Sequence, residues 1–231
     1  MAERRIVAMG GGGFSMEPEN PALDAFVLSL ARTQDRPRVC FIPTASGDSE
    51  RYVRDFYRAF AAHDCRPADL ALFERTESEL RAFLLAQDVI YVGGGSTANL
   101  LAVWRTHGLD AILQAAWEEG VVLCGVSAGM NCWFEASVTD SWLVGVAGPL
   151  HDGLGLLPGS ACPHYDGEPA RRPAFRRLVD AGALPPGWAA DDGAALVFGG
   201  RELREVVASR DGVAAYAVAP GEERRIEARR L

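Results

Sequence analysis

Short apolar runs without polar alternation constrain the fold of this sequence more than any other feature. Four of them occupy residues 5–10, 38–44, 88–94 and 121–126 and read RIVAMG, RVCFIPT, DVIYVGG and VVLCGV. Such runs are typical of strands buried on both faces, as in a parallel sheet. Segments with helical spacing lie between them, at residues 21–31, 49–62, 77–85, 97–105 and 109–119. The alternation predicts an α/β fold: a doubly wound, mostly parallel sheet with helices on both faces.

Glycine-rich turns follow three of the predicted strands, at residues 10–13, 93–95 and 125–129. In doubly wound sheets the ligand binds beyond the carboxyl ends of the strands. We therefore expect a functional site at the edge where these turns lie. The glycines at 10–13 either line this crevice or form only a tight turn.

After residue 135, loops rich in glycine, proline and histidine replace the regular alternation. The remaining predicted elements are a short helix and three strands, near residues 174–181, 194–198, 203–209 and 213–218. The last two strands flank an Asp211-Gly212 turn, which predicts a β-hairpin. No repeat or linker interrupts the sequence, so we expect a single domain over residues 1–231.

The chain of 231 residues contains no lysine, so all of its 23 basic residues are arginines. This excludes a lysine Schiff base, a Ser-Lys dyad and the lysine of a phosphate-binding P-loop. The 31 acidic residues give a formal charge of −8, which disfavours a nucleic-acid-binding or membrane-surface protein. A general base must therefore be one of the four histidines or a carboxylate, and an anionic substrate must be held by arginine.

The cysteines form no CxxC pair and most lie in apolar runs, which favours reduced core residues. They are Cys40, Cys65, Cys124, Cys132 and Cys162. A glycine run breaks the N-terminal apolar stretch, and no stretch approaches the roughly 18 apolar residues of a membrane span. We therefore expect a cytoplasmic protein without a signal peptide or membrane span. We also expect neither a metal nor a cofactor.

Residues 125–129 read GVSAG, a G-x-S-x-G sequence between the run VVLC and a helix expected at residues 130–136. A serine on a sharp strand-to-helix turn projects out of the packed layer, and a side chain at either glycine would collide with neighbouring backbone. The start of the helix directs free N–H groups toward a developing oxyanion. Ser127 is therefore the candidate nucleophile. The alternative is a simple βα turn with a capping hydroxyl.

A serine nucleophile needs a base. His63 lies in a charged stretch, and His107 precedes Gly108, where a histidine commonly caps a helix end. His151 and His164 lie in predicted loops. We prefer His164 because it belongs to the rigid, proline-led sequence CPHYD.

An orienting carboxylate should accept a hydrogen bond from the far ring nitrogen of the histidine. Asp192 precedes the apolar run AALVF, and two adjacent carboxylates that enter such a strand are otherwise costly. Asp140 and Asp166 are the competitors. Asp192 gives the chain order Ser-His-Asp, whereas Asp140 gives the Ser-Asp-His order of α/β-hydrolases.

Several features spread over most of the chain together resemble one family. They are the turn Gly93–Ser96 followed by Asn99 and Leu100, the GVSAG elbow, the pair Pro163-His164, the Gly167-Glu168 turn followed by arginines, and DDGAA at 191–195. This set resembles the peptidase E group of serine peptidases, which includes dipeptidase E (α-aspartyl dipeptidase) and, more distantly, cyanophycinase. The resemblance implies a fold related to class I glutamine amidotransferase domains.

By this resemblance, Ser127 is the nucleophile, His164 is the general base, and Asp192 stands where the family commonly carries a glutamate. Backbone N–H groups would hold the oxyanion. Ala128, the residue after the nucleophile, is the first expected donor, and the turn with Gly94 and Gly95 is the second because glycine permits close approach.

Dipeptidase E prefers an N-terminal aspartate, whose carboxylate requires a fixed cation. The candidates follow His164 closely and are Arg171, Arg172, Arg176 and Arg177. A guanidinium suits this task because it binds a carboxylate through two parallel hydrogen bonds, although the same residues could form a solvated helix face.

We expect a small peptide substrate, with Asp-Xaa dipeptides favoured. The open alternatives are a broader peptidase, a hydrolase of non-peptide acyl esters or amides, and a non-catalytic module that binds a small anion. A homo-oligomer is compatible with the sequence.

Overall fold

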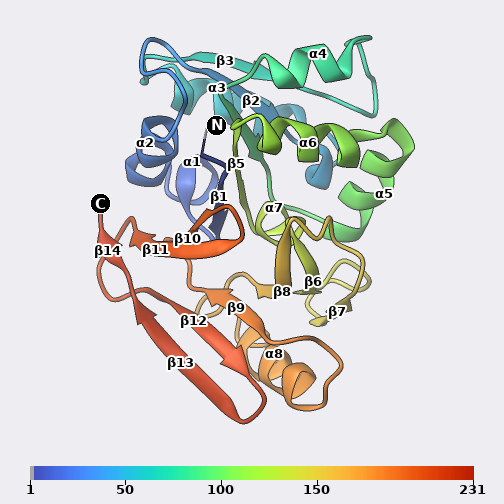
Figure 1. Cartoon of the computed structure of the whole chain (residues 1–231), viewed down its shortest axis with the longest axis vertical. Coiled ribbons are helices and arrows are strands. Elements are labelled where there is room, and N and C mark those ends of the chain that lie inside the picture. Colours follow the sequence, from blue (N-terminus) through green and yellow to red (C-terminus); the bar gives the residue numbers. More distant parts are fainter. Residues whose placement is uncertain (1–2) are drawn as a thin grey trace.

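The computed structural model describes residues 3–231, which form two β-sheets with helices packed around them (Figure 1). The larger sheet has eight strands in the order β14-β11-β10-β1-β5-β4-β2-β3. Its parallel part comprises β1 (Arg5–Met9), β5 (Val122–Val126), β4 (Val89–Val92), β2 (Arg38–Ile42) and β3 (Arg66–Asp69). Next to β1 it continues through the antiparallel strands β10 (Ala194–Gly199) and β11 (Glu202–Ala208) to the short β14 (Arg229–Arg230).

Helices cover both faces of this sheet because its strands are apolar on both sides. On β1, Ile6 and Ala8 belong to one core, whereas Val7 and Met9 belong to the other. The first core includes α4 (Leu80–Leu85), α5 (Thr97–His107) and α6 (Leu109–Glu118), and the second includes α1 (Gly13–Met16), α2 (Ala22–Ser29) and α3 (Glu50–Phe60) (Figure 1). A short 3-10 turn, Thr44–Ser46, follows β2. The predicted doubly wound α/β fold is confirmed.

The second sheet has six strands in the order β13-β12-β9-β8-β6-β7. They are β6 (Phe134–Thr139), β7 (Gly148–Leu150), β8 (Leu157–Cys162), β9 (Gly187–Ala190), β12 (Ala214–Ala219) and β13 (Glu222–Glu227). Helix α8 (Arg171–Asp180) packs against this sheet through Phe175 and Val179. Because β8 and β9 are parallel neighbours, the loops that follow them leave the sheet at the same edge.

Two predictions for the second half of the chain are wrong. The elbow is followed by the single-turn helix α7 (Ala128–Asn131), and the last part of the helix expected at 130–136 instead begins β6. The runs from Leu203 and Val213 do not form a hairpin, because β11 pairs with β10 whereas β12 pairs with β9 and β13. Strand pairing depends on partners distant in sequence, which local patterns do not encode.

Two simpler expectations, for the cysteines and for His107, are confirmed. All five cysteines are buried and unpaired. His107 ends α5, and Gly108 follows it with a φ of 67°, in the left-handed conformation common after a helix. Within residues 3–231, no helix is long and apolar enough to cross a bilayer.

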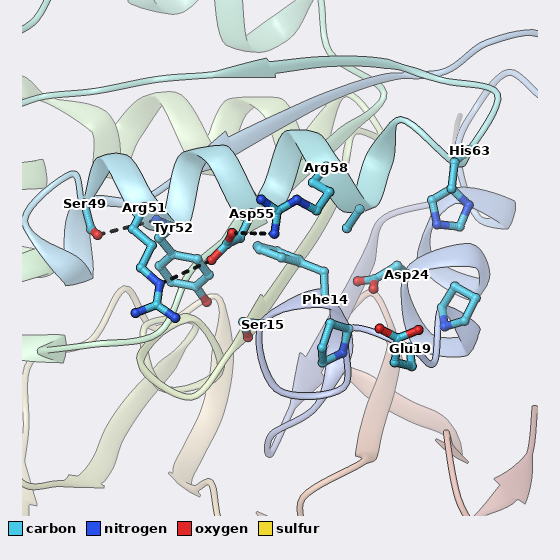
Figure 2. A pocket seen from close by; sticks show the side chains of 14 residues that line it. Phe14, Ser15, Glu19, Asp24, Ser49, Arg51, Tyr52, Asp55, Arg58 and His63 are labelled. Carbon is cyan, nitrogen blue, oxygen red and sulfur yellow. Dashed lines mark hydrogen bonds and ion pairs between the residues drawn. The ribbon is translucent and has the colours of Figure 1, made fainter.

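Asp24 is a carboxyl group buried in the helical layer over the larger sheet. It lies on α2 with 2% of its surface exposed, beside the groove between α3 and the α1–α2 segment (Figure 2). Burial raises the pKa of Asp24 from 3.8 to about 7, because the charged form is poorly solvated there. In the described part of the chain, its Oδ1 atom has no hydrogen-bond partner. The fold therefore favours the neutral acid.

We expect the stability advantage of Asp24→Asn over the wild type to grow with pH. The folded-state pKa of Asp24 lies above its unfolded value, so its stabilising contribution is full below about pH 4 and is lost as the pH rises through 7. Between pH 5 and pH 8, the difference in free energy of unfolding should change by about 2–3 kcal/mol, as measured by urea titration. Asp211→Asn, at a 94% exposed side chain, is the control and should show no such trend. Parallel pH profiles for Asp24→Asn and the wild type would contradict this assignment.

Candidate active site

The end of strand β1 holds the backbone of the predicted nucleophile and the predicted base. The Met9 carbonyl accepts a hydrogen bond from the N–H of Ser127 at 3.1 Å. The next carbonyl, that of Gly10, accepts one from the N–H of His164, also at 3.1 Å. Ser127 follows β5 and His164 follows β8, so one strand end joins residues from both sheets.

The third consecutive carbonyl of this segment holds the predicted acid. Gly11 accepts a hydrogen bond from the N–H of Gly193 at 3.1 Å, and it forms a parallel bridge with Asp192. Asp192 lies in the turn between β9 and β10. The glycine turn after β1 therefore does line the crevice, at the carboxyl edge where the sequence predicted a site.

Ser127 occupies a strained turn between β5 and α7. Its φ of 59° and ψ of −110° lie in a region that residues with side chains rarely adopt. A Cβ at Gly125 would overlap the backbone of Gly129, and a Cβ at Gly129 would overlap the carbonyl of Val92. The prediction that neither glycine tolerates a side chain is confirmed, and the turn leaves Ser127 half-buried.

His164 and Asp192 form a hydrogen-bonded pair. The Nδ1 atom of His164 lies 2.6 Å from Oδ1 of Asp192, and His164 is only 8% exposed. The backbone of His164 is left-handed, with a φ of 54°. A Cβ at Gly11 would overlap Oδ1 of Asp192, and a Cβ at Gly167 would overlap Oδ2. Because neither Gly11 nor Gly167 has a side chain, the Asp192 carboxylate has space to contact the imidazole ring of His164.

Side chains hold the main chain of Asp192 on both sides. Its N–H donates to Oδ1 of Asp166 at 2.7 Å, and its carbonyl accepts from Nη2 of Arg210 at 2.8 Å. Asp166, one of the competing acids, therefore contacts the backbone of Asp192 rather than a predicted catalytic side chain.

Asp140, the other competitor, faces different groups. Its Oδ1 accepts a hydrogen bond from Nη2 of Arg171 at 3.2 Å, and its Oδ2 accepts one from the N–H of Gly145, also at 3.2 Å. The structure therefore brings Asp192, rather than Asp140, to His164. The catalytic role of Asp192 stays a prediction.

The three predicted oxyanion donors are not equivalent. Gly94 lies against the nucleophile, since a Cβ there would be 3.4 Å from the Cβ of Ser127. Its N–H, however, donates to the hydroxyl of Tyr52 at 3.2 Å. In the part of the chain described, the N–H groups of Gly95 and Ala128 have no hydrogen-bond partner. These two therefore stay the predicted donors to an oxyanion.

The arginines predicted to bind substrate already face carboxylates. Arg171 is 3% exposed and donates from Nε to Glu168 at 2.6 Å. Arg172 donates two hydrogen bonds to Glu223, and Nε of Arg176 lies 4.0 Å from the same carboxylate. A substrate carboxylate would have to compete with these partners.

A groove of about 830 Å³ lies between α3 and the α1–α2 segment (Figure 2). Tyr52 lines the groove and links it to the site through its hydrogen bond with Gly94. On the α3 wall, Arg51 and Arg58 flank Asp55 (Figure 2). No cluster of three or more His, Cys, Asp or Glu side chains suited to a metal ion occurs within residues 3–231.

Sequence reasoning missed the contacts of Tyr52 and Arg210 with the site. Tyr52 lies in a helix that follows a different strand, and Arg210 lies beyond β11, so their contacts arise from chain crossings that no local pattern encodes. Asp166 stands two residues after His164, and this position made it a candidate for the orienting acid. The sequence did not indicate that it binds the backbone of Asp192 instead.

Comparison with known proteins identifies the chain as a serine peptidase with an α/β fold. The chain belongs to peptidase family S51, whose model matches residues 6–206. Its relatives include proteins named peptidase E, so the predicted membership of the peptidase E family is confirmed.

Three similar proteins illustrate the relationship. The chain is 54% identical over 217 residues to a Bacillus subtilis (strain 168) protein named "Uncharacterized peptidase YgaJ". The alignment covers 93% of this chain and 92% of that protein. It is 28% identical over 200 residues to Peptidase E of Streptomyces coelicolor, with 80% of each chain covered. A crystal structure of a peptidase from an acI-B1 Actinobacterium matches with a TM-score of 0.72 at 20% identity, over 98% of this chain and 95% of the other, and shows the same fold.

We expect Gly167→Ala to slow the reaction of Ser127 with a fluorophosphonate probe by about 100-fold, because the new methyl group would push the Asp192 carboxylate away from His164. The matched control is Gly148→Ala, since a Cβ at Gly148 meets nothing within 4 Å. Labelling rates should be compared at equal protein concentration. Labelling of both variants at the wild-type rate would show that the reaction of Ser127 does not depend on the position of the Asp192 carboxylate.

Proposed function

We propose that this protein is a serine dipeptidase that uses Ser127, His164 and Asp192 as its catalytic triad and favours dipeptides with an N-terminal aspartate. The observation that carries the proposal is the 2.6 Å hydrogen bond between His164 and Asp192. The backbone of this histidine bonds to the carbonyl of Gly10, next to the Met9 carbonyl that holds Ser127 in its strained turn. Membership of the peptidase E family supports the choice of a peptide substrate.

The triad carries out two acyl transfers. Ser127 Oγ attacks the peptide carbonyl while the free ring nitrogen of His164 takes the hydroxyl proton. Asp192 holds the Nδ1–H tautomer and stabilises the imidazolium that forms. When the tetrahedral intermediate collapses, the imidazolium gives its proton to the leaving amine and an acyl-enzyme remains. Water, deprotonated by His164, then attacks the ester of the acyl-enzyme, and the imidazolium returns the proton to Ser127 Oγ. This step releases the first amino acid and restores the free serine.

Backbone donors stabilise the oxyanion of both tetrahedral intermediates. The N–H groups of Gly95 and Ala128 are unpartnered in the described chain and serve as the donors. The N–H of Gly94 stays with Tyr52 and maintains the shape of the turn. In a water-poor site, each oxyanion donor contributes about 2.7–4 kcal/mol of transition-state stabilisation.

The preference for aspartate rests on the arginine cluster at the start of α8. Arg172 and Arg176 are half-exposed and share a single carboxylate, Glu223, so they can accept a second anion more readily than the buried Arg171. The same pairing favours one second candidate. If Glu223 keeps both arginines, the protein is a broader dipeptidase without an acidic specificity pocket. The five buried, unpaired thiols support a reducing environment, so we propose that the protein acts in the cytoplasm.

Ser127→Ala should abolish both fluorophosphonate labelling and dipeptide turnover, because no other group can form the acyl-enzyme. The substrates are Asp-Xaa dipeptides, neutral dipeptides and a short-chain nitrophenyl ester. Turnover of Asp-Xaa alone supports the aspartate preference, turnover of all dipeptides supports the broader peptidase, and turnover of the ester alone contradicts both. Normal dipeptide turnover by Ser127→Ala would rule out the mechanism.

Asp192→Asn should reduce kcat by about 10⁴-fold, since an asparagine holds the histidine in the wrong tautomer. Asp140→Asn is the matched variant, because Asp140 is the competing acid and contacts Arg171 instead of His164. It should change kcat far less. Steady-state kinetics on the best substrate of the panel decide between them, and the reverse ranking would transfer the role to Asp140.

A further inference from the structure

The carboxylate of Asp192 depends on its backbone for its position. An aspartate side chain has only two rotatable bonds, so fixing its Cα confines the carboxylate to a few orientations. The N–H of Asp192 donates to Oδ1 of Asp166 at 2.7 Å, and its carbonyl accepts from Nη2 of Arg210 at 2.8 Å. The two peptide groups that flank this Cα are therefore both held by charged side chains, in bonds stronger than neutral ones.

The two charged side chains also contact each other and the rest of the fold. Nη2 of Arg210 lies 3.5 Å from Oδ2 of Asp166, and Nε of Arg210 lies 3.7 Å from Oε1 of Glu17. Glu17 also accepts the hydroxyl of Ser209, whose N–H donates to the Gly193 carbonyl at 2.8 Å. The turn that carries the predicted acid is thus fastened to the end of α1 and to the segment after β11.

We propose that Asp166 and Arg210 are positioning residues that hold Asp192 against His164. Asp166 lies two residues after His164, so the histidine loop and the acid turn are joined twice, once through the His164–Asp192 pair and once through Asp166. The two loops therefore move as one body while the histidine gains and loses a proton. This inference rests on the proposed triad, in which Asp192 orients the histidine.

We call Asp166 and Arg210 the clamp on Asp192. The charges of the two side chains suit this positioning role. Asp166 alone would place a second negative charge near Asp192, which repels the charge that must face the imidazolium. Arg210 contacts Asp166 and the carbonyl of Asp192, so its positive charge offsets that of Asp166. Arg210 also faces Glu17, so its positive charge lies among the carboxylates of this turn, and the carboxylate of Asp192 is the one that contacts His164.

Three variants at two matched sites test the role of Asp166. Asp166→Ala removes the acceptor, whereas Asp166→Asn keeps an acceptor oxygen and removes only the charge. The control is Asp180→Ala, because the Asp180 side chain also accepts a backbone N–H at 2.7 Å, from Gly221, and both aspartates are exposed. A general loss of stability would therefore affect Asp180→Ala as well.

Two readouts separate positioning from catalysis. The first is the far-downfield proton NMR signal of the hydrogen shared by His164 Nδ1 and Asp192, which needs no substrate. The second is kcat on the best dipeptide. We expect Asp166→Ala to lose or broaden the signal and to lower kcat by about 100-fold, as for a misplacement of about 1 Å. Asp166→Asn should keep the signal and retain kcat within about threefold. Asp180→Ala should match the wild type in both.

Arg210 is tested in the same way. Arg210→Ala removes the donor to the Asp192 carbonyl and should weaken the signal and lower kcat about tenfold. Arg230→Ala is its control, since Arg230 has a similarly exposed side chain, 47% against 48%, paired with Asp211. The positioning role is overturned if Asp166→Ala keeps both the signal and the wild-type kcat, or if Asp180→Ala loses the signal equally. Loss of the signal in Asp166→Ala without loss of kcat supports the clamp and contradicts the proposed triad instead.

Discussion

Hydrogen bonds from the end of one strand organise the whole site. The consecutive carbonyls of Met9, Gly10 and Gly11 accept the N–H groups of Ser127, His164 and Gly193, each at 3.1 Å. These residues belong to loops after β5, β8 and β9, so the serine comes from the larger sheet and the histidine and acid come from the smaller one.

Tight packing around Ser127 and His164 keeps their backbones in strained conformations. Ser127 and His164 both have positive φ values, 59° and 54°, which cost roughly 1–3 kcal/mol each. Such conformations persist only where the surroundings enforce them. Around Ser127 this enforcement comes from glycines that allow close backbone contact, and around His164 it comes from the bond to Gly10 and the pair with Asp192. The strain is therefore located at the two groups that exchange a proton in the proposed mechanism.

The sequence predicted the parts of the fold in which local pattern and tertiary partner agree. The buried strands and intervening helices up to β5 follow from apolar runs that need two covered faces, and the elbow follows from its two glycines. Of the smaller sheet, only β12 was predicted as a strand, at residues 213–218. Its other strands, such as GPL and GWAA, carry small residues without a clear period. The clamp on Asp192 and the use of the Gly94 N–H by Tyr52 depend on chain crossings, so residue type alone does not indicate them.

In the proposed mechanism, the serine, histidine and aspartate held near the end of β1 form one catalytic unit. A crystal structure of the enzyme after reaction with a fluorophosphonate tests it most directly. We expect a phosphonate on Ser127 Oγ, with its phosphoryl oxygen bonded to the N–H groups of Gly95 and Ala128 and the His164–Asp192 bond intact. A phosphonate on another residue, or on Ser127 with His164 separated from Asp192, would contradict it.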